Sequence, residues 1–409
     1  MTGSRWRVVV QGAAALAVGI GVGRFVYTPI LPLMEHQAGM AVPTGSDLAT
    51  ANYAGYLIGA LAGTLVPALT RSRPALRASL LTVVVTLALM PVTSDTAVWL
   101  TLRLVAGAAS ALLFVIASSA IVGHLHQGAQ HLLGWGFGGV GAGIALSGAL
   151  VLALQSASAL PGSTWRASWW SAALLAGALS AAGWTLQPDP RREETASRPS
   201  GDLPRTRRWF AALLASYSLE GVGYIIAGTF LVAAISQNSP GWLGSGAWIV
   251  VGLAAVPAAA MWASLARRWS RSTLLLGALA VQTAGIALPA LAGGAVPALA
   301  SAVLFGNTFI AISSTAVAIG AHLQFPRSVA ILTAGYSAGQ MLGPLVVRPL
   351  LGGGSQPGGY HGALLAGAAI AGASAAAAAV LRVGFPHRVG DMVEPYAIAR
   401  ETPRSFTVF

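Results

Sequence analysis

Two ionisable side chains stand inside long apolar stretches of this chain. Arg24 lies near the middle of the run 8–34, and Glu220 lies near the middle of the run 209–236. A charge inside a membrane-crossing segment is costly, and it normally faces the bundle interior or a water-filled cavity. A guanidinium can hold a carboxylate or phosphate through two parallel hydrogen bonds, and a dehydrated carboxyl group can exchange a proton. The two residues therefore predict an anion-binding group and a proton-coupling group.

Each of these charges also has a purely structural interpretation. Arg24 could hold a backbone carbonyl, or the two residues could form a permanent buried salt bridge that joins two parts of the molecule. In the functional interpretation, protonation of Glu220 would release Arg24 to hold an anion. The sequence leaves both interpretations open.

Polar and aromatic side chains within the apolar runs could line a site together with these charges. The candidates for substrate binding, besides Arg24, are Tyr27, Thr28, Asn52, Tyr53, Tyr56, Tyr224, Asn307, Tyr336 and Gln340. The alternative for each is an interhelical hydrogen bond, which is the commoner role of such groups in membrane helices. Pro29 and Pro32 cannot donate backbone hydrogen bonds, so they either free the carbonyls of Phe25 and Thr28 for a ligand or merely kink the segment.

Other clusters of reactive residue types give no sign of metal, cofactor or catalytic chemistry. His124, His126 and His131 lie close together in the sequence, but the chain has no Cys and no carboxylate accompanies them. We therefore expect no metal site and no cofactor. No nucleophile–base pair or carboxylate cluster indicates an enzyme.

The amino-acid composition indicates that these residues lie in a membrane environment rather than in water. Hydrophobic residues make up 55% of the 409 residues and charged residues only 8%, whereas soluble proteins carry about a quarter charged residues. Apolar runs long enough to cross a bilayer occupy 8–34, 48–70, 75–94, 97–122, 130–156, 166–187, 209–236, 243–266, 272–293, 296–322, 328–351 and 360–384. The pattern predicts an all-α membrane protein with twelve transmembrane helices.

The 23 basic residues are all Arg, and all of them except Arg24, Arg103, Arg166 and Arg348 gather in alternate loops and at the termini. They occupy the N-terminus, residues 71–77, 191–208, 267–271, position 327 and the tail, whereas the intervening loops hold Glu35, Asp47 and Asp95. This asymmetry places both termini in the cytoplasm of a multi-pass protein of the bacterial inner membrane. The Arg residues form no single patch, so the formal charge of +12 does not indicate nucleic acid. Arg348, near the end of its run, is expected to extend to the lipid headgroups.

One hydrophilic stretch divides the chain into related halves. Residues 188–207 are rich in Pro and charge and predict a linker between six-helix bundles at 1–187 and 208–389, followed by a tail at 390–409. The sequence Gly21-Val-Gly recurs as Gly221-Val-Gly at an equivalent position in the second half. Such duplication is typical of transporters that alternate access around a central site.

Two short motifs resemble those of the major facilitator superfamily. The fourth run contains Arg103-Leu-Val-Ala-Gly107, and the eleventh contains Gly339-Gln-Met-Leu-Gly343-Pro344. With Gly-Val-Gly-Arg24 in the first run and Leu-Glu220-Gly-Val-Gly in the seventh, the chain resembles the YbfB/YjiJ branch. The resemblance implies two pseudo-symmetric six-helix bundles and transport, with Arg103 bracing neighbouring helices. The basic loop after the second run lacks the family's customary Asp, which puts its usual charge relay in doubt.

These observations together predict a secondary active transporter for a small organic solute. An anionic solute and coupling to protons are options that the residues leave open. The predicted partners are the substrate and the lipid bilayer, with the chain acting as a monomer. The alternatives are a proton-antiport exporter of drugs or metabolites and, from a different class, a membrane-embedded enzyme or lipid-handling protein.

Overall fold

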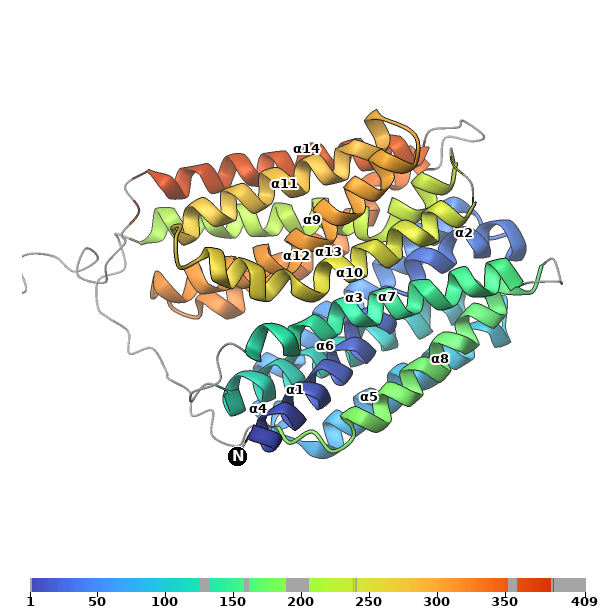
Figure 1. Cartoon of the computed structure of the whole chain (residues 1–409), viewed down its shortest axis with the longest axis horizontal. Helices are drawn as coiled ribbons and strands as arrows, with labels where there is room; N and C mark the ends of the chain where they lie inside the picture. The colour runs from blue at the N-terminus through green and yellow to red at the C-terminus, as the bar shows by residue number, and fades with distance from the viewer. Residues whose placement is uncertain are drawn as a thin grey trace, which may run out of the picture.

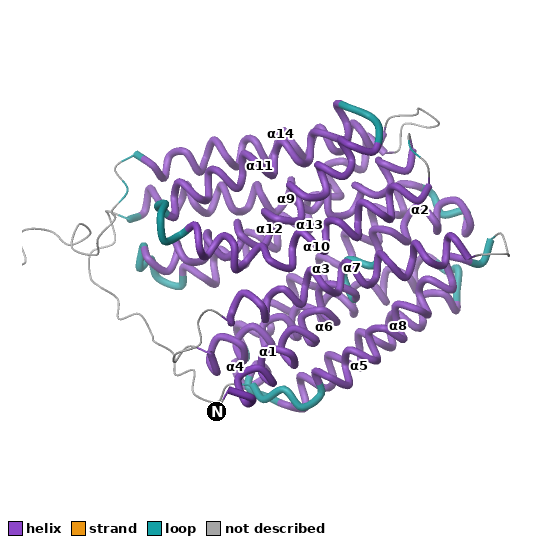
Figure 2. The backbone as a smooth tube through the Cα atoms, viewed as in Figure 1, coloured by secondary structure: helices purple, strands orange, loops and turns teal. Residues whose placement is uncertain are grey.

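The computed structural model describes residues 2–125, 132–157, 162–188, 206–237, 239, 241–351, 359–383 and 385. Helices account for nearly all of these residues, and short turns connect them (Figure 2). The predicted tail at 390–409 and almost all of the predicted linker at 188–207 lie outside the described residues, as do His126 and His131. The prediction of an all-α protein is confirmed for the described part of the chain.

The helices of the first half come before the predicted linker. They are α1 (Thr2–Leu16), the π-helical turn η1 (Ala17–Val22), α2 (Tyr27–Ala38), α3 (Val42–Leu65), α4 (Pro67–Thr70), α5 (Arg73–Leu89), η2 (Met90–Val92), α6 (Thr96–Leu125), α7 (Leu133–Ala157) and α8 (Thr164–Gly183). The second half contains α9 (Arg207–Gln237), α10 (Gly241–Leu265), α11 (Arg271–Leu291), α12 (Ala295–His322), α13 (Ser328–Leu351), α14 (Gly359–Ala379) and η4 (Val380–Arg382).

Each predicted span overlaps one of these helical segments. Ten segments among the described residues are long and apolar enough to cross a membrane, and one of them runs from α1 through η1 to α2. Helices α3 and α8 are not among the ten. The structure therefore supports a multi-pass membrane protein, while the count of twelve crossings stays a prediction.

The two halves form separate helix groups that pack side by side (Figure 1). The main contacts between them are α7 with α10, α3 with α13, and α2 with α9, and α2 also touches α10. Helices α1, α5 and α9 begin at the same end of the bundle, which also carries the Arg-containing turns at 71–73 and 267–271. We call this the Arg-rich end, and the end where α2 meets α3 the opposite end.

The first span is broken where its Arg stands. Widened π-type hydrogen bonds run from the Gly23 amide to the Val18 carbonyl (2.8 Å) and from the Phe25 amide to the Ile20 carbonyl (3.2 Å). Regular helix resumes only at Tyr27. The Phe25 carbonyl accepts the Thr28 amide at 3.2 Å, so the prediction that Pro29 frees this carbonyl is wrong. Isolated π turns inside helices often mark functional positions.

Glycines set the distance between α3 and α6. A Cβ at Gly55 would meet the backbone of Leu104, and a Cβ at Gly107 would meet the backbone carbonyl of Asn52. Neither neighbour is a flexible side chain that could move away. The close approach of these helices therefore depends on glycine, as small-residue motifs in membrane helices predict.

The substitution Gly107→Ala should lower the melting temperature of the purified protein by several degrees. The added methyl group would force α3 and α6 apart, and overpacking of this kind costs about 1–3 kcal/mol. Gly177→Ala on α8 is the control, because nothing lies within 4 Å of a Cβ at that position. Equal melting temperatures for the two variants would show that the contact between α3 and α6 accommodates an added methyl group without loss of stability.

Candidate functional site

Arg24 is buried at the break of the first span, and only 4% of its surface is exposed. Its guanidinium carbon lies over the rings of Tyr56 (4.6 Å), Tyr53 (4.7 Å) and Phe25 (5.1 Å). Ring faces attract a cation. Aromatic rings of α3 and of the broken span therefore surround the charge.

The aromatic rings leave part of the guanidinium unsatisfied. The Nε and Nη2 atoms of Arg24 are buried and have no hydrogen-bond partner. A ring attracts the charge, but it offers no oxygen to an N–H group. A buried charged donor without an acceptor is costly, so this feature calls for an explanation.

Arg103 on α6 fixes the backbone beneath Arg24. Its Nη1 donates to the Gly23 carbonyl (3.3 Å) and its Nη2 to the Arg24 carbonyl (3.4 Å). The backbone carbonyl of Arg103 accepts a hydrogen bond from the side-chain amide of Asn52 (2.9 Å). The charge of Arg103 also lies over the Tyr27 ring at 4.7 Å. Arg103 thus binds the two carbonyls that the break exposes. Asn52 and Tyr27 contact Arg103 and not the guanidinium of Arg24.

The second half contributes a wall of stacked rings facing this region. Tyr224 on α9 stacks with Phe305 and Phe309 of α12, each at 5.5 Å between ring centroids, and with Tyr336 of α13 at 6.3 Å. Phe25 reaches across from the first half and packs edge-on against Tyr224.

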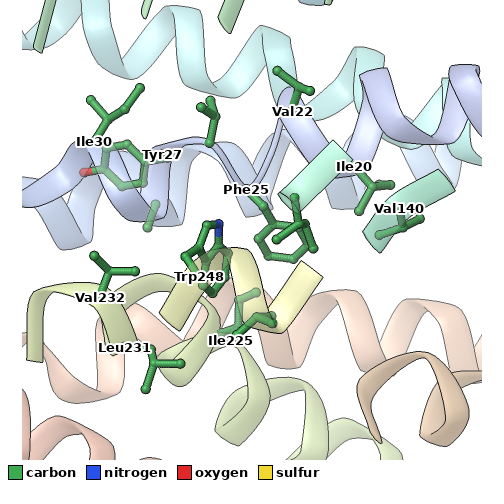
Figure 3. Close-up of a cluster of buried hydrophobic side chains, with 14 of the residues drawn as sticks. Ile20, Val22, Phe25, Tyr27, Ile30, Val140, Ile225, Leu231, Val232 and Trp248 are labelled. Atoms are coloured by element: carbon green, nitrogen blue, oxygen red, sulfur yellow. The ribbon is translucent and has the colours of Figure 1, made fainter. Parts of the chain in front are cut away.

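Phe25 also packs edge-on against Trp248 of α10 (Figure 3). The sequence analysis did not single out Trp248, Phe305 or Phe309. Aromatic residues in apolar runs give no signal that separates this wall from lipid-facing positions.

Glu220 on α9 is fully buried, and neither of its carboxylate oxygens has a hydrogen-bond partner of ordinary geometry. The side-chain amide of Gln282 on α11 interacts with this carboxyl group, and its oxygen and nitrogen are likewise buried without a hydrogen bond of ordinary geometry. The sequence analysis also missed Gln282, although a Gln within an apolar run could have indicated it. The two side chains form a buried polar pair between α9 and α11.

Arg24 and Glu220 do not form an ion pair in this structure. Within the described part of the chain, an ion pair is instead formed by Arg348 and Asp47. Tyr336 lies within electrostatic reach of both charges, and Tyr224 lies beside it. Tyr336 therefore lies near both charges, and the direct salt bridge, one of the two interpretations that the sequence left open, is not formed in this conformation.

The remaining candidates have other contacts. Asn307 accepts the indole N–H of Trp262 through its side-chain oxygen (2.9 Å) and so ties α12 to α10. The Thr28 hydroxyl donates to the Gly228 carbonyl (2.5 Å), and the Tyr53 hydroxyl pairs with Thr229 (3.0 Å). Gln340 is buried one turn beyond Tyr336, and its amide oxygen is unpartnered.

The structure therefore brings Arg24, Tyr53, Tyr56, Tyr224 and Tyr336 together. It assigns structural hydrogen bonds to Tyr27, Thr28, Asn52 and Asn307. In the case of Tyr27, the hydroxyl group donates to the Gly45 carbonyl at 2.8 Å.

A set of cross-half contacts closes the opposite end of the bundle. Arg348 of α13 donates through Nε to Oδ1 of Asp47 (2.8 Å) and through Nη2 to Oδ2 (3.2 Å). The adjacent Ser46 hydroxyl donates to the Pro344 carbonyl at 2.7 Å. Tyr360 of α14 donates to Glu35 of α2. Arg348 was expected to extend to the headgroups; the structure adds a partner that the sequence did not reveal, a carboxylate 301 positions away.

The chain matches the sequence model of the family described as "uncharacterised MFS-type transporter YbfB" over residues 16–381. It belongs to this MFS-type transporter family. The suspected YbfB branch of the major facilitator superfamily is thereby confirmed. No curated protein sequence matches the chain.

Two solved structures have a similar fold. Both are described as the nucleoside transporter NupG, one of them as a mutant form. The mutant form gives a TM-score of 0.69 at 13% identity and covers 92% of this chain and 99% of its own. The other gives 0.67 at 12% identity, with 93% and 99% covered. At this identity the likeness shows the fold alone. Family and fold favour a membrane transporter over an enzyme.

In this MFS-type transporter, Asp47→Asn should open the opposite end more often. The change removes the charge pair between α3 and α13, which is partly exposed and so contributes no more than about 1 kcal/mol. The thiol-labelling rate of a single Cys introduced at Val347, a buried neighbour of Arg348 on α13, should rise by up to about fivefold. The absence of native Cys removes background labelling.

Asp95→Asn provides the control for this experiment. Asp95 is an acidic residue of the first half near the same end, and it caps α6 through the Ala97 and Val98 amides. An equal rise in labelling for the two variants would show that loss of charge, and not of the cross-half pair, changes the accessibility of position 347.

Proposed function

We propose that this chain is a secondary transporter that moves a small organic anion by alternating access, with Arg24 as the anion-binding group. The observation that carries the proposal is the buried guanidinium whose Nε and Nη2 have no acceptor. It lies where the rings of the two halves meet, so an anion bound there would contact both halves. Intramembrane charge of this kind marks substrate pathways in transporters.

The proposed topology has twelve crossings in two six-helix halves, with both termini in the cytoplasm of the bacterial inner membrane. The alternating distribution of Arg supports this orientation and makes the Arg-rich end cytoplasmic. The contacts of Asp47, Ser46 and Glu35 with the second half lie at the opposite end. These contacts would then close the conformation described here towards the outside.

Proton coupling is proposed to reside in the buried pair of Glu220 and Gln282. A carboxyl group without a cation beside it is most stable in a dry site as the neutral acid. When Glu220 loses its proton, its negative charge attracts the positive charge of Arg24 across the tyrosine pair Tyr224 and Tyr336. Binding of the anion and of the proton would therefore favour each other.

The main alternative is a proton-antiport exporter of amphipathic drugs or metabolites. The ring wall around Tyr224 favours it, since apolar walls hold such compounds without a charge contact. Binding that persists when Arg24 is changed would favour this alternative. The described residues hold no cluster of three or more His, Asp or Glu side chains that could bind a metal ion, and nothing specific favours an enzyme or lipid-handling protein.

Arg24→Lys should weaken anion binding at least about tenfold, because an ammonium cannot form two parallel hydrogen bonds and hydrogen bonds to charged groups contribute about 1.5–3 kcal/mol. The measurement is the rise in melting temperature of purified protein across a panel of organic anions. Arg7→Lys, an exposed Arg of the same span, should behave as the wild type. Equal anion-induced shifts in Arg24→Lys and the wild type would rule out the proposed site.

Glu220→Gln should abolish the response of transport to a pH gradient while leaving substrate binding intact. The amide keeps the shape of the neutral acid but cannot exchange a proton. Uptake of a ligand found in the anion panel is measured in proteoliposomes with and without an imposed gradient, with Asp95→Asn as the control. Persistence of the wild-type response to the gradient in Glu220→Gln would assign coupling to another group.

A further inference from the structure

The unpartnered edge of Arg24 has a definite shape. The N–H bonds of Nε and Nη2 lie side by side on one edge of a guanidinium and match the two oxygens of a carboxylate. The same chain demonstrates this fit at the opposite end, where Nε and Nη2 of Arg348 bind the two oxygens of Asp47 at 2.8 and 3.2 Å. In Arg24 this same pair of nitrogens is buried and unpartnered. The matching ligand group is a carboxylate bound side-on.

The charge balance of the site limits the ligand to one negative charge. Arg103 is the other arginine buried among the described residues, and it already binds the carbonyls of Gly23 and Arg24. The Arg24 charge is therefore the one available to an anion. A second carboxylate would lose its hydration in a low-dielectric site with no cation beside it, which is unfavourable.

The rings around this charge define the body of the ligand. Tyr53 and Tyr56 of the first half lie against the guanidinium. In the second half, Tyr224 is inclined to Phe305 by only 17° and to Tyr336 by 24°. Nearly parallel rings can accept one more flat ring against them. A sugar body would instead bring hydroxyl groups that these faces cannot hydrogen-bond.

We propose that the substrate is a planar aromatic monocarboxylate. Its carboxylate binds side-on to Nε and Nη2 of Arg24, and its ring lies between the tyrosines of the first half and the ring wall of Tyr224, Phe305 and Tyr336. This inference rests on the proposed function, because it specifies the anion that Arg24 takes. A ligand of this shape contacts both halves at once.

The test is the binding of matched compounds to the purified full-length protein, followed by calorimetry and thermal shift. Benzoate and 2-naphthoate are the aromatic monocarboxylates, and cyclohexanecarboxylate has the same charge without a flat ring. Benzamide keeps the ring without the charge, terephthalate adds a second charge, and uridine represents a neutral nucleoside.

At least one aromatic monocarboxylate should bind about two- to tenfold more tightly than cyclohexanecarboxylate, as ring stacking predicts. It should bind at least about tenfold more tightly than benzamide and terephthalate, because these lose the charged contact or add an unpaired charge.

The outcomes separate the two proposals. Cyclohexanecarboxylate or terephthalate could bind as tightly as the aromatic monocarboxylates or more tightly, and this binding could be lost in Arg24→Lys. That result overturns the proposal of an aromatic monocarboxylate and keeps the proposal of an anion site at Arg24. Failure of every aromatic monocarboxylate to bind at millimolar concentration also overturns it. Binding of uridine or benzamide that persists in Arg24→Lys overturns both proposals.

A ring-removal variant tests the wall directly. Phe305→Leu should reduce the preference for benzoate over cyclohexanecarboxylate to near unity while leaving the dependence on charge unchanged. Phe210→Leu is the matched control, because Phe210 stacks on Phe325 in a separate apolar cluster. The ligand-free melting temperature of both variants reports whether they fold. An unchanged ring preference in folded Phe305→Leu contradicts the proposed position of the ligand ring, and Arg24→Lys provides the test if Phe305→Leu does not fold.

Discussion

The structure is organised around one unusual electrostatic condition, a buried guanidinium that forms no ion pair among the described residues. Several features of the first half maintain it. The π turn removes Arg24 from regular helical winding, Arg103 binds the two carbonyls that the break exposes, and tyrosine rings cover the charge. None of these contacts supplies an acceptor for Nε and Nη2. The protein thus maintains a cation that only an added group can satisfy, which distinguishes it from the paired Arg348.

The two halves contribute different parts to this arrangement. The first half provides the cation, and the second provides the ring wall of Tyr224 and, further inside, the acid Glu220 with its amide neighbour Gln282. The duplicated Gly-Val-Gly segments thus carry Arg24 in one half and lie directly after Glu220 in the other. The two halves thus contribute ionisable groups of opposite sign, and Tyr336 lies near both.

Much of the framework could be predicted from the sequence because apolar runs, loop arginines and short motifs are local signals. Arg24 and Glu220 were identifiable for the same reason, since a charge within an apolar run is visible without a structure. Contacts between distant segments were not, and the pairing of Asp47 with Arg348 is an example. The ring wall could not be predicted either, because the sequence does not distinguish a Phe such as Phe305 or Phe309 that faces lipid from one that faces a ligand. The break in the first span was expected near its prolines, yet it begins earlier, at Ala17.

The break also determines how the first span can bend. Helix α1 packs within its own half against α6, α7 and α8, whereas α2 packs both against α8 of its own half and against α9 of the second half. The two pieces therefore differ in their contact with the second half, and the residues between them form the joint. Because Arg24 is part of that joint, a rocking motion of the halves would turn its side chain as the span flexes. Substrate binding by Arg24 and the side of the membrane to which the site opens would then change in a single movement.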